Sequence, residues 1–193
     1  IINNTHPSLE YEVSLSKSGL PTLSYLGIKG KKKYLLSKYD PAQEAKRFIK
    51  SLDTSECTNF IVMGIGLGYH ITELIKTTSE YSRILVIEND RSLIRLAFET
   101  NDLKLILTHP GLTLVFSDQQ KDTIEVLEKE KVNFSLNGYQ LIQQNSLSEV
   151  NTKRTNELLA GIKNIFQAST IELKTQSAKS KIFYKNIYKN YSN

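Results

Sequence analysis

The stretch Asn59-Phe-Ile-Val-Met-Gly-Ile-Gly-Leu-Gly-Tyr-His70 decides the fold, together with a second apolar run at Arg83-Ile-Leu-Val-Ile-Glu88. The first stretch is an apolar run of strand length that ends at three glycines and is followed by a segment of helical periodicity. The second run ends on a carboxylate, Glu88. The order of strand, glycine turn, helix and strand predicts a βαβ unit with parallel strands.

The spacing between the glycines and the acid predicts a nucleotide site. Glu88 lies 24 positions after Gly64, close to the roughly 20 residues at which a Rossmann-type unit places an acid on a ribose hydroxyl. The glycines Gly64, Gly66 and Gly68 read G-x-G-x-G rather than G-x-G-x-x-G. This resembles the first motif of S-adenosylmethionine-dependent methyltransferases. The resemblance implies that Glu88 holds the ribose and that Asp118, after the third strand, meets the adenine.

Each of these residues also has a structural interpretation, and both stay open at the level of sequence. Three glycines permit a tight turn and close packing without any ligand. Glu88 caps the next helix in competition with Asp90, and Asp118 caps the third helix. Tyr69 and His70 lie at the mouth of the turn, where a histidine donates to a phosphate, acts as an acid or packs at a helix start.

The rest of the chain predicts an α/β fold, Rossmann-like (methyltransferase-like), with a mostly parallel sheet, an N-terminal β-meander and a long C-terminal helical segment. Residues 9–37 read as the meander, with a turn at Gly30-Lys31-Lys32-Lys33 before a short third strand at 34–36. Asp40, Pro41 and Glu44 predict a helix start with a capping box. Further strands are expected at 60–63, 84–87, 112–116 and within 132–142. Helices are expected at 69–77, from 90, at 103–107 and at 121–129.

Apolar residues recur at helical spacing over some forty residues after Ser146, with no proline. A helix of that length cannot bury its whole apolar stripe on a small domain. We therefore predict three segments: 1–55, the meander plus one helix; 56–145, the Rossmann-like core; and 146–193, a basic helical connector to a further domain or a contact between copies.

Composition narrows the classes of function. The net charge is +5, and the basic excess lies after Asn151, a distribution that suits a solvated helix face better than a nucleic-acid surface. Cys57 is the one cysteine, so no intrachain disulfide forms and a cytoplasmic location is expected. Three scattered histidines give no zinc spacing. No apolar run approaches the roughly 20 residues of a membrane span, and no signal peptide is visible.

Three motifs together resemble the N-terminal region of the motility-associated-factor (Maf) glycosyltransferases, bacterial proteins that attach nonulosonic (sialic-acid-like) sugars to flagellin. They are Ser37-Lys38-Tyr39-Asp40-Pro41 with Glu44-Ala45, then Gly64-Ile65-Gly66-Leu67-Gly68-Tyr69-His70, then Val86-Ile87-Glu88-Asn89-Asp90. The resemblance implies a role in flagellar assembly and motility. In that family the transfer chemistry is ascribed to a following central domain that uses an activated sugar nucleotide.

The resemblance implies an accessory module that does not turn over alone. Its partners would be the downstream catalytic domain of the same polypeptide, flagellin and a second copy bound through the C-terminal helix. Since the sequence lacks an initiator methionine, we expect it to be a piece of a longer chain. Two alternatives remain: a methyltransferase acting on small molecules, and a non-catalytic Rossmann-like scaffold. No catalytic residue, metal site or cofactor is assignable beyond a nucleotide ligand at the glycine turn.

Overall fold

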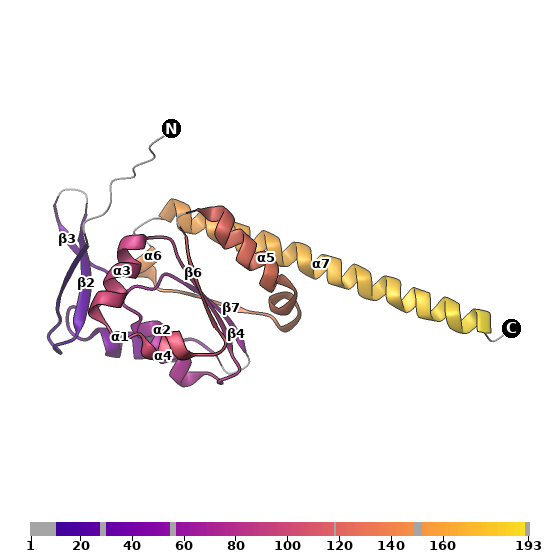
Figure 1. Ribbon diagram of the computed structural model, residues 1–193, viewed down its shortest axis with the longest axis horizontal. Helices are drawn as coiled ribbons and strands as arrows, with labels where there is room; N and C mark the ends of the chain where they lie inside the picture. The colour runs from indigo at the N-terminus through magenta and orange to yellow at the C-terminus, as the bar shows by residue number, and fades with distance from the viewer. Residues whose placement is uncertain (1–10, 28–29, 55–56, 118, 149–151, 192–193) are drawn as a thin grey trace, which may run out of the picture.

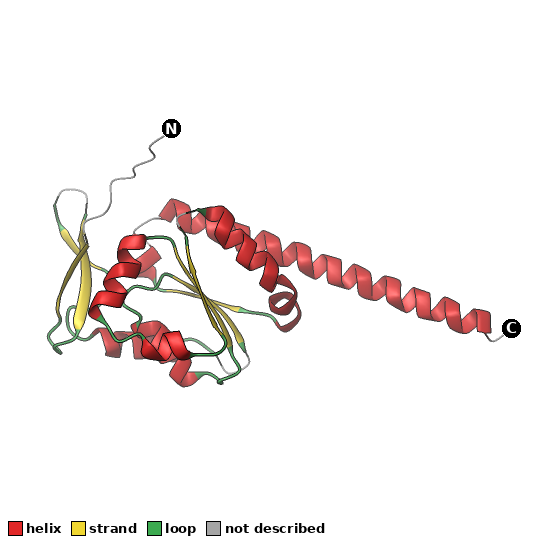
Figure 2. Ribbon diagram, in the orientation of Figure 1, coloured by secondary structure: helices red, strands yellow, loops and turns green. Residues whose placement is uncertain are grey.

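The computed structural model describes residues 11–27, 30–54, 57–117, 119–148 and 152–191. A small antiparallel sheet lies beside a parallel sheet with helices on both faces, and one long helix projects from the body (Figures 1 and 2). The predicted α/β class, the N-terminal meander, the parallel sheet and the long C-terminal helix are all confirmed.

The meander consists of β1 (Tyr11–Leu15), β2 (Pro21–Leu26) and β3 (Lys32–Tyr34), paired antiparallel in that order. The predicted position of the third strand was wrong, because Lys32 and Lys33 belong to β3 and the two leucines follow it. The backbone N–H groups of Leu35 and Leu36 both donate to the carbonyl of Leu23, at 2.8 and 3.2 Å. This bend turns both leucines into the core, where they are buried.

Helix α1 (Pro41–Lys50) begins at the predicted cap, where Asp40 Oδ1 accepts from the N–H of Gln43 at 2.9 Å. The capping box expected between Asp40 and Glu44 does not form. Glu44 Oε2 accepts from the N–H of Ser37 at 2.9 Å, and Ser37 Oγ accepts from the N–H of Asp40 at 3.2 Å. The carboxylate therefore ties α1 to the segment before it.

The central sheet has the order β6-β5-β4-β7, and each neighbouring pair is parallel. Its strands are β4 (Asn59–Met63), β5 (Arg83–Glu88), β6 (Leu112–Phe116) and β7 (Gln140–Gln143). Alternate residues face opposite sides, as strand geometry requires. Phe60 and Val62 enter one core cluster, whereas Ile61 and Met63 enter the other.

The first cluster joins the sheet to the meander, to α1 and to the helices α2 (Tyr69–Thr77), α3 (Arg91–Thr100) and α4 (Lys104–Thr108). The second joins the other face to α5 (Gln120–Asn137) and α7 (Thr152–Tyr191). The first cluster crosses both boundaries drawn from sequence, since it includes Leu23 and Leu147, and the second crosses the boundary at 145. The division at 55 and 145 stays a prediction.

Helix α5 is longer than the predicted 121–129. It extends to Asn137 and so includes the first part of residues 132–142, within which a fourth strand was expected. Leu127 and Phe134, two turns apart, are both buried against α7, so the helical periodicity continues through them. Gly138, at φ 71°, then ends the helix and admits β7.

Helix α7 has 40 residues, and every buried residue among its described side chains lies in its first half. Its last buried residue among those with a described side chain is Ser169, and Ile171 is 65% exposed. This confirms that the helix does not bury its whole stripe. In the described part of the chain, no helix combines the length and the apolar character that a membrane span requires.

Candidate functional site

The glycine turn connects β4 to α2 at the carboxyl end of the parallel sheet. Gly64, Gly66 and Gly68 have φ of 87°, 52° and 85°, a region that residues with a Cβ rarely adopt. The N–H of Gly64 donates to the carbonyl of Ile87 at 2.8 Å, which ties the turn to β5. All three glycines are therefore required by the backbone, as the sequence predicted for a tight strand-to-helix turn.

The turn is enclosed by other parts of the chain. A Cβ on Gly68 would lie 2.7 Å from Leu103 Cδ2, and one on Gly66 would lie 3.1 Å from Leu147 Cδ1. Residues 65–70 are all buried. Leu103, the N-cap of α4, and Leu147 of the short helix α6 (Asn145–Ser148) thus pack directly against the glycines.

Glu88 ends β5 with its carboxylate directed at the turn. Its Oε2 accepts from the N–H of Ile65 at 2.9 Å, and its Oε1 accepts from the N–H groups of Asn89 and Asp90 at 2.7 and 2.8 Å. The side chain is 6% exposed. Burial raises the pKa of Glu88, and the three N–H donors oppose that rise.

Asp90 is the N-cap of α3, since its Oδ1 accepts from the N–H of Ser92 at 2.8 Å. Its other oxygen, Oδ2, accepts from the hydroxyl of Tyr11 at 2.7 Å. Burial and this bond to Asp90 raise the pKa of Tyr11. The contact fixes the meander beside the Glu88 turn. Sequence reasoning missed it because 79 residues separate the partners.

Tyr69 and His70 begin α2 but point in different directions. The hydroxyl of Tyr69 donates to the carbonyl of Pro21 at 2.9 Å, and burial raises the pKa of Tyr69 to about 12. His70 is 1% exposed, with Nε2 at 3.1 Å from the carbonyl of Gly64. Burial lowers the pKa of His70 to about 4, so the ring is neutral near pH 7 and Nε2–H is the donor.

A model of the family described as the glycosyltransferase Maf N-terminal domain matches residues 8–146. The chain belongs to this family. The match spans all three motifs on which the resemblance was drawn, so that resemblance is confirmed. A search of curated proteins found no match.

In this Maf N-terminal domain the structure brings only some of the predicted site residues together. Gly64, His70 and Glu88 are in contact through the backbone of the turn. Tyr69 is directed to the meander instead. Asp118 lies outside the described residues, and Gln119 is the N-cap of α5. The nucleotide-binding role of the whole set stays a prediction.

Leu147 is the residue at the turn that sequence reasoning did not identify. It is buried, and α6 is held by a hydrogen bond from Ser146 Oγ to the carbonyl of Leu35, at 2.6 Å. Nothing in the local sequence Asn145–Ser148 signals a contact with glycines some 80 residues earlier. This segment reaches the carboxyl end of the sheet because it follows directly after β7, which pairs with β4 in parallel.

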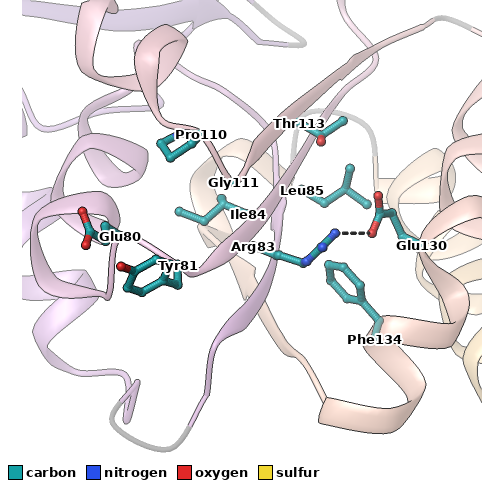
Figure 3. A pocket seen from close by; sticks show the side chains of 10 residues that line it. All are labelled: Glu80, Tyr81, Arg83, Ile84, Leu85, Pro110, Gly111, Thr113, Glu130 and Phe134. Atoms are coloured by element: carbon teal, nitrogen blue, oxygen red, sulfur yellow. Dashed lines mark hydrogen bonds and ion pairs between the residues drawn. The ribbon is translucent and has the colours of Figure 1, made fainter.

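A separate cavity of about 290 Å³ lies at the opposite end of the strands (Figure 3). Arg83, the first residue of β5, forms its wall with Glu130 of α5, and their side chains are 3.3 Å apart. Tyr81, Pro110 and Gly111 complete the rim. The cavity is therefore remote from the glycine turn. Within the described part of the chain, no cluster of three His, Cys, Asp or Glu side chains suits a metal ion.

Proposed function

We propose that this domain is the accessory N-terminal module of a bacterial glycosyltransferase that attaches nonulosonic acids to flagellin and so supports flagellar assembly and motility. The observation that carries the proposal is the family match over residues 8–146. A family described as an N-terminal domain implies a further domain in the same polypeptide, and we assign the transfer reaction to that domain.

The interior of the glycine turn supports an accessory role. Leu147 packs against two glycines, and Glu88 accepts one N–H of the turn, that of Ile65, together with those of Asn89 and Asp90 after β5. His70 is neutral, enclosed and bonded to the backbone, so it offers no free acid to a substrate. This arrangement stabilises the Rossmann-like frame, and the frame in turn positions α7.

Transfer assays on two proteins test the proposal. The 193-residue chain, mixed with flagellin and a cytidine-monophosphate-activated nonulosonic acid, is expected to add no sugar mass to flagellin. The full-length protein is expected to add it, and deletion of residues 8–146 from that protein is expected to leave flagellin unmodified in cytoplasmic extracts. Transfer by the isolated chain would show that the module itself is catalytic, and unchanged modification after the deletion would show that it is dispensable.

The methyltransferase alternative is favoured by one observation, the position of Glu88 at the end of β5 beside the glycine turn. Thermal unfolding with S-adenosylmethionine, S-adenosylhomocysteine, NAD, CMP and UDP separates the two functions. A ligand at about a hundred times its Kd stabilises by roughly 2.7 kcal/mol, a shift of about 5–10 °C for this size. A shift with the adenosyl compounds alone supports the methyltransferase, and a shift with CMP places part of the donor site here. The absence of a shift in Tm with all five compounds supports the accessory module.

A further inference from the structure

A second cavity, of about 450 Å³, lies at the amino end of the parallel sheet. It is enclosed by the end of α1, the end of α2 and the segments that lead into β4 and β5. It shares no lining residue with the cavity of Figure 3, and the glycine turn lies at the other end of β4. Its lining is rich in hydroxyl groups, which belong to Thr54, Thr58, Thr77, Thr78, Ser79 and Ser82.

Ser82 contributes a buried polar atom that the fold does not satisfy. The residue is 1% exposed, and its Oγ has no hydrogen-bond partner among the described residues. Buried hydroxyl groups without a partner cost free energy and are rare in folded proteins. Because Ser82 lines the cavity, a polar group of a bound molecule would supply the missing partner.

Two threonines at the end of α2 offer acceptors to the cavity rather than donors. Thr77 Oγ1 donates to the carbonyls of Glu73 and Leu74, at 2.9 and 3.1 Å. Thr78 Oγ1 donates to the carbonyl of Leu74 at 2.8 Å. A hydroxyl has one proton to donate, so both protons are used within the helix. Only lone pairs of these two oxygens remain for a ligand, which must therefore be a donor.

The electrostatic environment of the cavity favours positive charge. Helix α1 ends at Lys50 and α2 ends at Thr77, and both residues line the cavity. The C-terminus of a helix carries a partial negative charge, so the fields of two such ends add there. Among the lining residues, the carboxylate of Asp53 and the ammonium of Lys50 carry opposite charges. The two helix ends therefore decide the balance.

We propose that this cavity binds a small organic cation, a primary amine whose ammonium group is held by the acceptors of the lining, Ser82 Oγ among them. An ammonium has three N–H donors and no acceptor, which complements such a lining. Ile49 and Leu52 also line the cavity and offer apolar surface to the carbon chain of the amine. A carboxylate or a phosphate would instead face lone pairs and two negative helix ends. This inference does not rest on the function proposed above.

Cys57 permits a direct test, because it is the one cysteine of the chain and it lines the cavity. Its rate of modification by a neutral disulfide reagent is measured on the 193-residue chain with putrescine, its terminal diol analogue or succinate. These probes have similar carbon chains and differ in charge, and potassium chloride equalises the ionic strength. Putrescine is expected to slow the modification at least about threefold, with saturation, once most of the cavity is occupied. No slowing by putrescine, or equal slowing by the diol, succinate or the salt alone, would overturn the proposal.

Two matched threonine variants locate the site. Thr77 and Thr108 are both exposed near a helix end, and each donates to the carbonyl four residues earlier at 2.9 Å. Thr77 lines the cavity, whereas Thr108 does not. Thr77→Val is expected to raise the Kd for putrescine at least about threefold, and Thr108→Val to change it less than about 1.5-fold. Equal effects would place the amine elsewhere on the protein.

Variants of Ser82 and Lys50 test the roles of the two groups. Ser82→Ala removes a hydroxyl that has no internal partner, so the fold should keep its Tm while the Kd for putrescine rises. Lys50→Gln removes the competing cation and is expected to lower that Kd. A rise with Lys50→Gln would mean that the cavity selects anions. The transfer assays above do not involve this cavity, so the two proposals fail separately.

Discussion

Glu88 Oε2 accepts a hydrogen bond from the N–H of Ile65 at 2.9 Å, which locks the end of β5 to the middle of the glycine turn. The predicted pair of glycine turn and distant acid is thus a direct contact in the fold. This hydrogen bond is buried. Glu88 Oε1 also accepts hydrogen bonds from the N–H groups of Asn89 and Asp90, which lie between β5 and α3. The same carboxylate therefore holds three segments of backbone.

Replacing Glu88 by alanine is expected to destabilise the fold strongly. One buried N–H group, that of Ile65, and two half-buried ones, those of Asn89 and Asp90, would lose their acceptor. One unsatisfied buried group alone costs about 1–3 kcal/mol. We expect a loss of at least about 2 kcal/mol in urea unfolding, or roughly 4–8 °C in Tm. The control is Glu99→Ala, which breaks only the exposed pair with Arg95 and is expected to cost less than about 1 kcal/mol. Equal effects of the two variants would contradict this role of Glu88.

Stability is expected to fall below pH 6.5 because of His70. Its pKa is lowered by burial to about 4 in the fold, so the unfolded chain takes up a proton first as the pH falls and unfolding becomes more favourable. This pH dependence is half-maximal at pH 6.5, the ordinary pKa of histidine, and fades within about one pH unit above it. Between pH 7 and pH 5 the free energy of unfolding should drop by about 2 kcal/mol from this residue. His70→Gln lacks this titration, and parallel pH curves for the two proteins would exclude the effect.

Leu147→Ala is expected to destabilise the domain by roughly 2–3 kcal/mol, because it empties the space against Gly64 and Gly66. Leu136→Ala deletes the same atoms from a side chain that is 65% exposed, so it should cost less than about 0.5 kcal/mol. Chemical denaturation of both variants measures the difference. A small effect at Leu147 would mean that α6 does not close the turn tightly.

The sequence predicted local elements well and long-range contacts poorly. Helix α2 spans Tyr69–Thr77 as expected, because the glycines that begin it and its apolar stripe are local signals. The extension of α5 to Asn137 was missed because no local signal separates a continuing helix from a buried strand over short apolar runs. The contacts of Tyr11 with Asp90 and of Leu147 with the glycines arise only when the sheet brings distant segments together. Both contacts lie at the candidate site, so the sequence did not predict that distant segments enclose the glycine turn.

Two glycine-to-alanine variants separate backbone strain from packing at the turn. Gly68 and Gly19 have nearly equal positive φ, 85° and 82°, so alanine costs about 1–3 kcal/mol of backbone strain at either position. At Gly19 nothing lies within 4 Å of the added Cβ, whereas at Gly68 it meets Leu103 Cδ2 at 2.7 Å and Ile106 Cδ1 at 3.0 Å. Both atoms belong to buried side chains that cannot swing into solvent. Gly68→Ala is therefore expected to lose about 1–3 kcal/mol more than Gly19→Ala. Urea unfolding measures the two losses, and if they were equal, the packing of α4 onto the glycine turn would not explain why glycine is required there.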